Sequence, residues 1–236
     1  MNPWNAAELQ FDASAFSGVA RLFPLPNLVL YPHVMQPLHI FEPRYRELLE
    51  YAIGDDGLIA MALLEPGWET DYEGRPPLSP YACLGKIVTH HCLEDGRYNV
   101  LLLGVHRIRL VREVEPPRSF RQAAVELLED CYHGISSQQL ATLHRELLEG
   151  FQRQLPAGCQ GSDQLPELLS ENAPLGLLTD LAAYTLPLSI AVKQQLLAES
   201  RVAVRAKTLL AEMENMTVGE AIGVAADGFP PPFSVN

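Results

Sequence analysis

The sequence has little lysine, few cysteines and no long hydrophobic run. Its lysines are Lys86, Lys193 and Lys207, and its four cysteines form no C-x-x-C pair, so a structural zinc site has little support. No apolar stretch approaches the ~18–20 residues that span a bilayer. The first residues, MNPWNAAELQ, lack the charged and apolar regions of a secretory signal. We therefore expect a cytoplasmic protein with no membrane partner, no bound metal and buried free thiols.

Positive charge is also scarce. The net charge is −12, from 29 acidic and 17 basic residues, and such a field repels nucleic-acid backbones. The main basic run comprises Arg107, Arg109, Arg112, Arg118 and Arg121. Stacking of bases needs aromatic residues among the charges, and Phe120 alone lies nearby. We do not expect nucleic acid as a partner, and we expect these arginines to pair on the outer face of a sheet with Glu113, Glu115 and Glu126.

Amino-acid composition and hydrophobic spacing divide the chain into four parts. Residues 1–18 are polar and rich in Ala and Ser, which predicts a flexible arm. Strand signals dominate 19–130, whereas Leu, Ala and Gln at helical spacing dominate 131–214. The last part, 215–236, is rich in proline near its end and is expected to be a flexible tail. These parts predict a β domain followed by a helical bundle.

Proline, glycine and turn-forming residues indicate where the strands and the helix of the β part begin and end. The run LVLYP predicts a short strand over 28–32, and Glu42-Pro43 predicts the start of a helix. The apolar run at 57–65 predicts a buried strand, and 65–80 an exposed loop. Asp95-Gly96 separates two long strand patterns, which is typical of a hairpin. Gly104, inside the second pattern, predicts a bulge or a sharp coil of the strand. Short strands with few helices between them favour a coiled antiparallel sheet or a small barrel.

The helical part has clear amphipathic spacing. Leu residues and a phenylalanine recur at helical intervals in its first helix, at Leu140, Leu143, Leu147, Leu148 and Phe151. Ser189 follows a proline and precedes an apolar run, so we expect it to be an N-cap. We expect about four helices here.

Taken in order, several short motifs resemble one known family. They are Pro24-Leu25, Pro32, Pro37-Leu38, Gly85, Gly104-x-x-Arg107, and Leu186-Pro187-Leu188 followed by Lys193-Gln194. Over residues 19–214 the chain resembles the N-terminal, substrate-binding domain of the ATP-dependent Lon protease. The resemblance implies an α+β fold in which a PUA-like β pseudobarrel, with one short helix, precedes a C-terminal helical bundle. It also implies binding of unfolded or tagged polypeptides.

The residues needed for Lon's own chemistry are not found in the sequence. A phosphate-binding loop requires G-x-x-x-x-G-K-[ST], but Gly85-Lys86 is followed by Ile87. Few lysines are available for a Ser-Lys dyad. We therefore expect a stand-alone, non-catalytic module without ATPase or protease domains and without a cofactor. It would recognise unfolded or extended polypeptide segments, as an adaptor to a protease or a chaperone. The alternative is a PUA-like protein that binds RNA or a small molecule, and the oligomeric state is left open.

The candidate binding surface lies in a segment broken by Pro24, Pro26, Pro32 and Pro37. Prolines cannot donate to a sheet ladder, so these four either set the path of a closed sheet or leave an adaptable apolar surface exposed. The second interpretation predicts a peptide-binding surface made by Tyr31, His33, Val34, Met35 and Phe41. The loop 65–80 could add Trp68 and Tyr72 as an aromatic flap.

Two other polar groups invite a functional interpretation. His90-His91-Cys92 could suggest a metal site, but neighbouring residues of a strand point to opposite faces. Asp55-Asp56 could suggest paired acid–base catalysis, but acids in a turn are more often solvated. We expect neither a catalytic nor a metal site.

Overall fold

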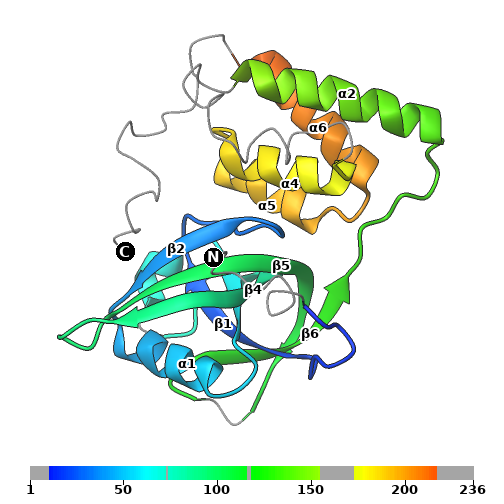
Figure 1. Cartoon of the computed structure of the whole chain (residues 1–236). Helices are drawn as coiled ribbons and strands as arrows, with labels where there is room; N and C mark the ends of the chain where they lie inside the picture. Colours follow the sequence, from blue (N-terminus) through cyan, green and yellow to red (C-terminus); the bar gives the residue numbers. More distant parts are fainter. Residues whose placement is uncertain (1–10, 73, 116–117, 155–172, 217–236) are drawn as a thin grey trace, which may run out of the picture. The chain divides into compact units, whose positions relative to one another are not determined.

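The computed structural model describes residues 11–72, 74–115, 118–154 and 173–216 (Figure 1). These residues form two compact units that divide between Leu128 and Glu129. We call them the barrel unit and the helical unit and describe each by itself.

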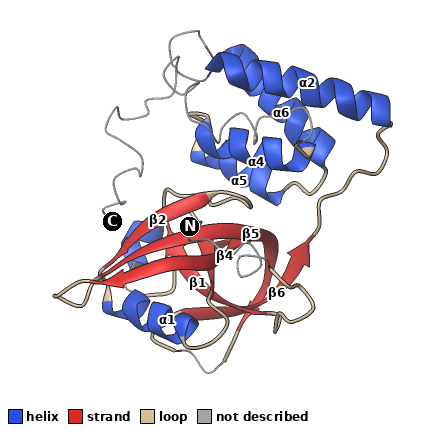
Figure 2. Ribbon diagram, viewed as in Figure 1, coloured by secondary structure: helices blue, strands red, loops and turns tan. Residues whose placement is uncertain are grey.

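The barrel unit contains six strands (Figure 2). They are β1 (Val19–Leu25), β2 (Met35–Ile40), β3 (Leu58–Leu64), β4 (Leu78–Cys92), β5 (Tyr98–Glu113) and β6 (Arg121–Leu128). Their order is β2-β5-β4-β3-β1-β6, and β5 also pairs with β6. This second pairing closes five strands into a barrel and leaves β2 attached to the side of β5. The expected small barrel is therefore present.

One strand pair departs from the predicted antiparallel arrangement. β1 and β3 run parallel, with Leu22 opposite Ala60, while the other pairs are antiparallel. A parallel pair needs a crossover connection. β2 and helix α1 (Pro43–Ile53) supply it, and Pro43 stands at the start of that helix as predicted. Because β1 and β3 are parallel and the other pairs are antiparallel, the sheet is mixed.

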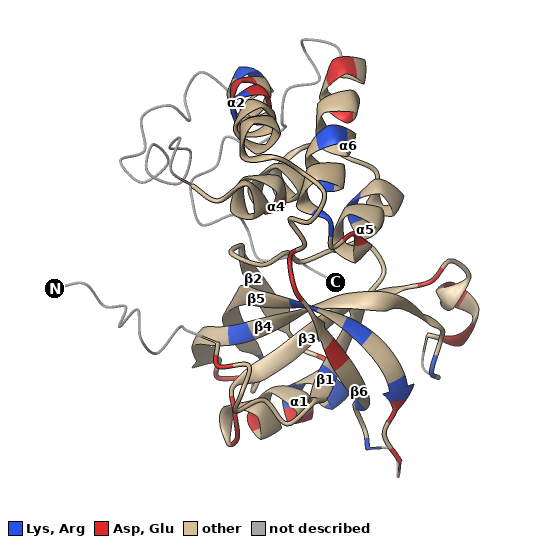
Figure 3. Ribbon diagram, turned by 90° about the vertical axis from the view of Figure 1, so that its right-hand side faces the viewer, with Lys and Arg blue, Asp and Glu red and all other residues tan. Residues whose placement is uncertain are grey.

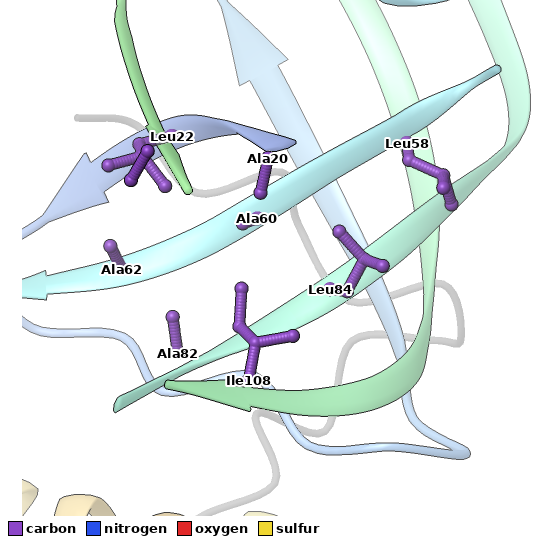
Figure 4. Packing of buried hydrophobic residues seen from close by; sticks show 9 residues of the cluster. Ala20, Leu22, Leu58, Ala60, Ala62, Ala82, Leu84 and Ile108 are labelled. Carbon is purple, nitrogen blue, oxygen red and sulfur yellow. The ribbon is translucent and has the colours of Figure 1, made fainter. Parts of the chain in front are cut away.

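The interior of the barrel is filled by small and branched residues (Figure 4). The cluster alternates along each strand, as side chains on one face must: Ala20, Leu22, Leu58, Ala60, Ala62, Ala82, Leu84, Ile108 and Ala123. Phe11 and Phe16, from the described part of the predicted arm, pack against it. Ile59 and Met61 of β3 are buried as well, so β3 is covered on both faces, as its continuous apolar run predicts.

The long hairpin β4–β5 forms around the predicted turn. Gly96 has a φ of +79°, which suits glycine, and Leu93 N–H donates to the Arg97 carbonyl at 2.8 Å. The strand register shifts between Leu84 and Gly85, opposite Gly104. The bulge predicted at Gly104 is confirmed.

The helical unit contains α2 (Ser137–Gln154), α4 (Leu175–Thr185), α5 (Ile190–Ala198) and α6 (Val202–Asn215). The Ser189 hydroxyl accepts a hydrogen bond from Val192 N–H at 3.3 Å, which confirms the predicted N-cap. α2 buries Leu143, Leu147 and Phe151. None of the helices in the described ranges combines the length and hydropathy needed to cross a bilayer.

Candidate functional site

The segment before β2 forms an irregular turn, so the strand predicted over 28–32 is wrong. The cause is a close approach to Gly104 of β5. His33 N–H donates to the Gly104 carbonyl and Gly104 N–H donates to the Val34 carbonyl, both at 2.8 Å. A Cβ on residue 104 would overlap the Tyr31 carbonyl oxygen and lie 2.8 Å from its carbon. Glycine at 104 therefore permits the turn.

His33 stands at the tip of this turn in a left-handed conformation. Its φ is +67°, and among the described residues it is the one non-glycine residue with a positive φ. Its side chain is exposed. A residue with a Cβ held in this region stores strain, so the turn is maintained by its contacts with Gly104.

The turn separates the predicted surface residues into two groups. Tyr31 and Val34 are 0% and 4% exposed, so the expectation that they form part of an exposed surface is wrong. The contacts of the turn with Gly104 direct both side chains into the core. Met35 and Phe41 are 40% and 37% exposed, and His33 is exposed too. Trp68 and Tyr72 are half-buried.

β2 itself is an edge strand. Among the described strands it pairs with β5 alone, from Met35 opposite Leu103 to Ile40 opposite Tyr98. The Val34 carbonyl accepts a hydrogen bond from β5, so every second residue from Val34 turns its backbone toward β5. The backbone groups of Met35, Pro37 and His39 consequently point away from the sheet. Pro37 fits this position because it has no N–H to donate.

A polar contact holds the outward side chains of β2, and the sequence analysis did not find it. His39 Nδ1 lies 2.8 Å from Asn99 Oδ1, and Arg97 Nη1 lies 3.3 Å from His39 Nε2. The contacts suit a tautomer in which Nδ1 carries the hydrogen and Nε2 accepts from arginine. The His39 and Phe41 rings are 6.4 Å apart. The outer face of β2 therefore presents Met35, His39 and Phe41.

The loop between β3 and β4 is anchored to the start of α1. It contains a short 3-10 helix, η1 (Trp68–Asp71), and the Trp68 and Tyr72 rings pack edge to face at 5.5 Å. The Tyr72 hydroxyl donates to Glu42 Oε1 at 2.5 Å. Burial raises the pKa of Tyr72, and the hydrogen bond to Glu42 acts in the same direction. Burial alone would lower the pKa of Arg44, but Tyr45 and Glu42 raise it overall.

Comparison with known proteins identifies the family. Residues 19–215 match the family model of the ATP-dependent protease La (LON) substrate-binding domain. The chain belongs to this family. It is 30% identical over 194 residues to Lon protease 2 of Desulfotalea psychrophila, covering 80% of this chain and 24% of that protein. It is 29% identical over 195 residues to Lon protease of Escherichia coli, covering 82% and 24%. The chain thus spans about a quarter of these relatives.

Solved structures of the Lon family share the fold. The Lon N-terminal domain protein from Xanthomonas campestris superposes with a TM-score of 0.61 at 24% identity, covering 82% of this chain and 97% of that one. The N-terminal domain of the Mycobacterium avium complex Lon protease gives 0.64 at 16% identity, covering 84% and 100%. The predicted α+β class, with a β barrel before C-terminal helices, is confirmed.

The motifs behind the Lon resemblance have structural roles in this chain. Gly104 admits the turn at Tyr31, as described above. Lys193 Nζ donates to the Tyr184 carbonyl at 2.7 Å near the end of α4, and burial lowers the pKa of Lys193. Within the described residues no three His, Cys, Asp or Glu side chains lie close enough to hold a metal ion, and His90 and His91 are exposed.

The charged residues of the Lon-type barrel agree with the sequence-based expectations only in part. Asp55 and Asp56 are not merely solvated, because both form ion pairs with the buried Arg21, at 2.5 Å for Asp56. The pairs Arg109–Glu126, at 2.6 Å, and Arg121–Glu113 are present as predicted. Arg107 is instead buried.

The cysteines were expected to be buried free thiols. Those the structure describes form no disulfide, but their burial differs: Cys83 is buried, Cys131 is half-buried and Cys92 is exposed. Cys92 lies at the end of β4, next to the hairpin turn, where the strand leaves the core. Cys159 lies outside the described residues.

Proposed function

We propose that this Lon-type domain binds extended polypeptide segments as an added strand along the outer edge of β2. The observation that carries the proposal is the edge itself. β2 pairs on one side with β5, and the backbone groups of Met35 and His39 point to the other side. A ligand strand can pair with these outward groups whatever its sequence, because every residue except proline offers the same backbone groups.

The side chains beside this edge suit a ligand of variable sequence. Met35, the first residue of β2, and Phe41, which directly follows the strand, are exposed large apolar residues. A thioether adapts its shape, and an aromatic ring offers a large contact area. A segment from an unfolded protein would bury its own apolar side chains against them.

Pro37 limits how strongly the edge can pair. It has no N–H, and its carbonyl already accepts a hydrogen bond from the Gln36 side chain at 2.9 Å. Met35 and His39 remain as pairing positions. The net contribution of each hydrogen bond to the binding free energy is about 0.5–1.5 kcal/mol. We infer weak, reversible capture, which suits a domain that hands segments to a protease or a chaperone. The same interruption protects the edge against aggregation.

A proline substitution tests the edge directly. The probe is a fluorescein-labelled, reduced and carboxymethylated protein that stays unfolded, titrated by fluorescence anisotropy. His39→Pro removes one outward N–H, and His39→Ala removes the side chain but keeps that N–H. We expect His39→Pro to weaken binding several-fold more than His39→Ala. Equal affinities for the two variants would contradict the proposal.

A second pair of variants tests the apolar contacts. Met35→Ser combined with Phe41→Ser should weaken binding at least tenfold, because both side chains are exposed and contribute contact area. Ile53→Ser combined with Val111→Ser removes apolar residues of similar exposure elsewhere on the barrel unit. The control should bind as the unchanged protein does, and an equal loss in both doubles would mean that the surface on β2 is not specific.

A further inference from the structure

A second candidate site lies in the barrel unit, in a pocket of about 270 Å³. Its walls come from β1, the start of α1, the end of β3, the loop before β4 and the segment that leads into β6. Its lining includes the apolar residues Pro24, Tyr45, Leu64 and Phe120 and four arginines: Arg44, Arg75, Arg118 and Arg121. Figure 3 shows basic residues gathered on and beside β6. This concentration of positive charge contrasts with the chain's net charge of −12.

Carboxylates neutralise these arginines only in part. Glu42 pairs with Arg44 at 2.9 Å. Glu113 bridges Arg75, at 2.8 Å, and Arg121. Arg118 makes no ion pair with any residue that the structure describes. Among the described residues, four guanidinium groups therefore share two paired carboxylates. A third carboxylate, Glu47, bonds the Ser119 hydroxyl at 2.6 Å rather than an arginine.

Aromatic rings hold the guanidinium groups in place. The Arg44 guanidinium lies 4.8 Å from the Tyr45 ring centroid and 4.8 Å from that of Tyr72. Arg118 lies 4.4 Å from the Tyr51 centroid and 5.9 Å from that of Phe120. A cation held by stacking loses little conformational entropy when it binds a ligand. The pocket is therefore prepared for an anion.

We propose that this pocket binds a phosphate monoester. Arg118, which has no ion pair among the described residues, and the two arginines that share Glu113 attract the charge of about −1.5 to −2 that such a group carries at pH 7. Guanidinium forks donate two parallel hydrogen bonds to phosphate oxygens. A carboxylate carries less charge than a phosphate monoester, so the same arginines would hold it more weakly. The volume corresponds to about nine waters at ~30 Å³ each, enough for a phosphate group and a small attached organic group.

The phosphate could be part of a free small molecule or of a phosphorylated side chain in a polypeptide. Two probes distinguish these sources: glycerol 2-phosphate, and a fluorescein-labelled dodecapeptide with one phosphoserine. The same peptide with serine is the control for the phosphate. Tighter binding of the phosphopeptide, by tenfold or more, assigns the ligand to polypeptides, and equal affinities assign it to free phosphates. Either result supports the pocket, provided that the serine peptide binds at least tenfold more weakly than the phosphopeptide.

Two substitutions with opposite expected effects on affinity test the pocket. Binding to the full chain is measured by calorimetry and by fluorescence anisotropy. Arg118→Gln should weaken binding of both phosphate probes about tenfold or more, because it removes a charged donor. Glu113→Gln should strengthen binding, because it removes a competing carboxylate from Arg75 and Arg121. Arg145→Gln, at an exposed position of α2, is the charge-matched control and should change nothing.

Binding of neither probe at 10 mM, or binding that Arg118→Gln leaves unchanged, would overturn the proposal. Its failure is distinguishable from failure of the β2 edge. Arg118→Gln should leave binding of the unfolded, unphosphorylated protein unchanged, and His39→Pro should leave glycerol 2-phosphate binding unchanged.

Discussion

Arg205 of α6 forms a two-pronged ion pair with Asp130, a residue 75 positions earlier in the chain. Its Nη1 and Nη2 atoms lie 2.7 and 2.8 Å from the two carboxylate oxygens. Nε donates to the Thr179 hydroxyl at 3.1 Å, and Nη1 also donates to the Glu199 carbonyl at 3.0 Å. Arg205 is 1% exposed. One side chain thus joins the segment before α2 to α4 and α6.

Arg205→Ala should destabilise the helical unit by about 3–5 kcal/mol, because it removes a buried cation that pairs with Asp130 and lies 3.9 Å from the buried Asp180. Arg205→Lys should recover only part of the loss, since lysine cannot form the fork. Unfolding in urea, followed by far-UV circular dichroism, measures both. Arg201→Ala, which breaks an exposed pair with Glu199, is the control and should cost under about 1 kcal/mol. A cost for Arg205→Ala no larger than that of the control would contradict this role.

Gly104→Ala should destabilise the barrel unit by about 2 kcal/mol or more. A methyl group there would overlap the Tyr31 carbonyl, and backbone on both sides would have to move. Gly67→Ala is a useful comparison, because a Cβ there meets nothing within 4 Å, although its positive φ adds strain. Urea unfolding should show the larger loss at Gly104, and a smaller loss there would mean that the contact with Tyr31 is not rigid.

His33→Gly should leave stability unchanged or raise it by up to about 1 kcal/mol, because glycine adopts a positive φ without strain. His33→Val should lower stability by about 1–2 kcal/mol, since a β-branched residue fits this region poorly. Thermal unfolding of the two variants provides the measurement. If the valine variant matched the glycine variant, the turn would not be strained.

The ion pairs of Glu113 should make stability sensitive to acid. Burial raises the pKa of Glu113, but Arg121 and Arg75 outweigh it and lower the pKa below the ordinary 4.5. A lowered folded-state pKa stabilises the fold above the unfolded value, and that stability is lost as pH falls through the folded value. The gap in unfolding free energy between the unchanged protein and Glu113→Gln should therefore be full at pH 6 and shrink steadily below pH 4.5. A gap that stays constant down to pH 3 would contradict the lowered folded-state pKa of Glu113.

Local signals were sufficient for part of the fold. Pro43, the Asp95-Gly96 turn and Ser189 each have a short-range physical reason to stand where they do, and each prediction is confirmed. The prediction of a strand over 28–32 was wrong because of a contact between residues far apart in the sequence. LVLYP has strand composition, but Tyr31 meets Gly104 on a strand far along the chain.

The candidate sites were harder to predict for the same reason. The exposure of Met35 and Phe41 followed from the broken pattern around Pro37, but the contact of His39 with Asn99 depends on the register of β2 against β5. The arginine pocket gathers side chains from positions 44, 75, 118 and 121, whose proximity only the closed barrel creates.

The most direct test of the central claim is hydrogen exchange at individual amides of β2, measured by NMR with and without an unfolded polypeptide. The outward amides of Met35 and His39 should exchange more slowly when the polypeptide is bound, because a ligand strand then accepts their hydrogen bonds. The inward amides of Leu38 and Ile40, which face β5, should change little. Protection confined to other parts of the chain, with Met35 and His39 unchanged under saturating ligand, would contradict the account.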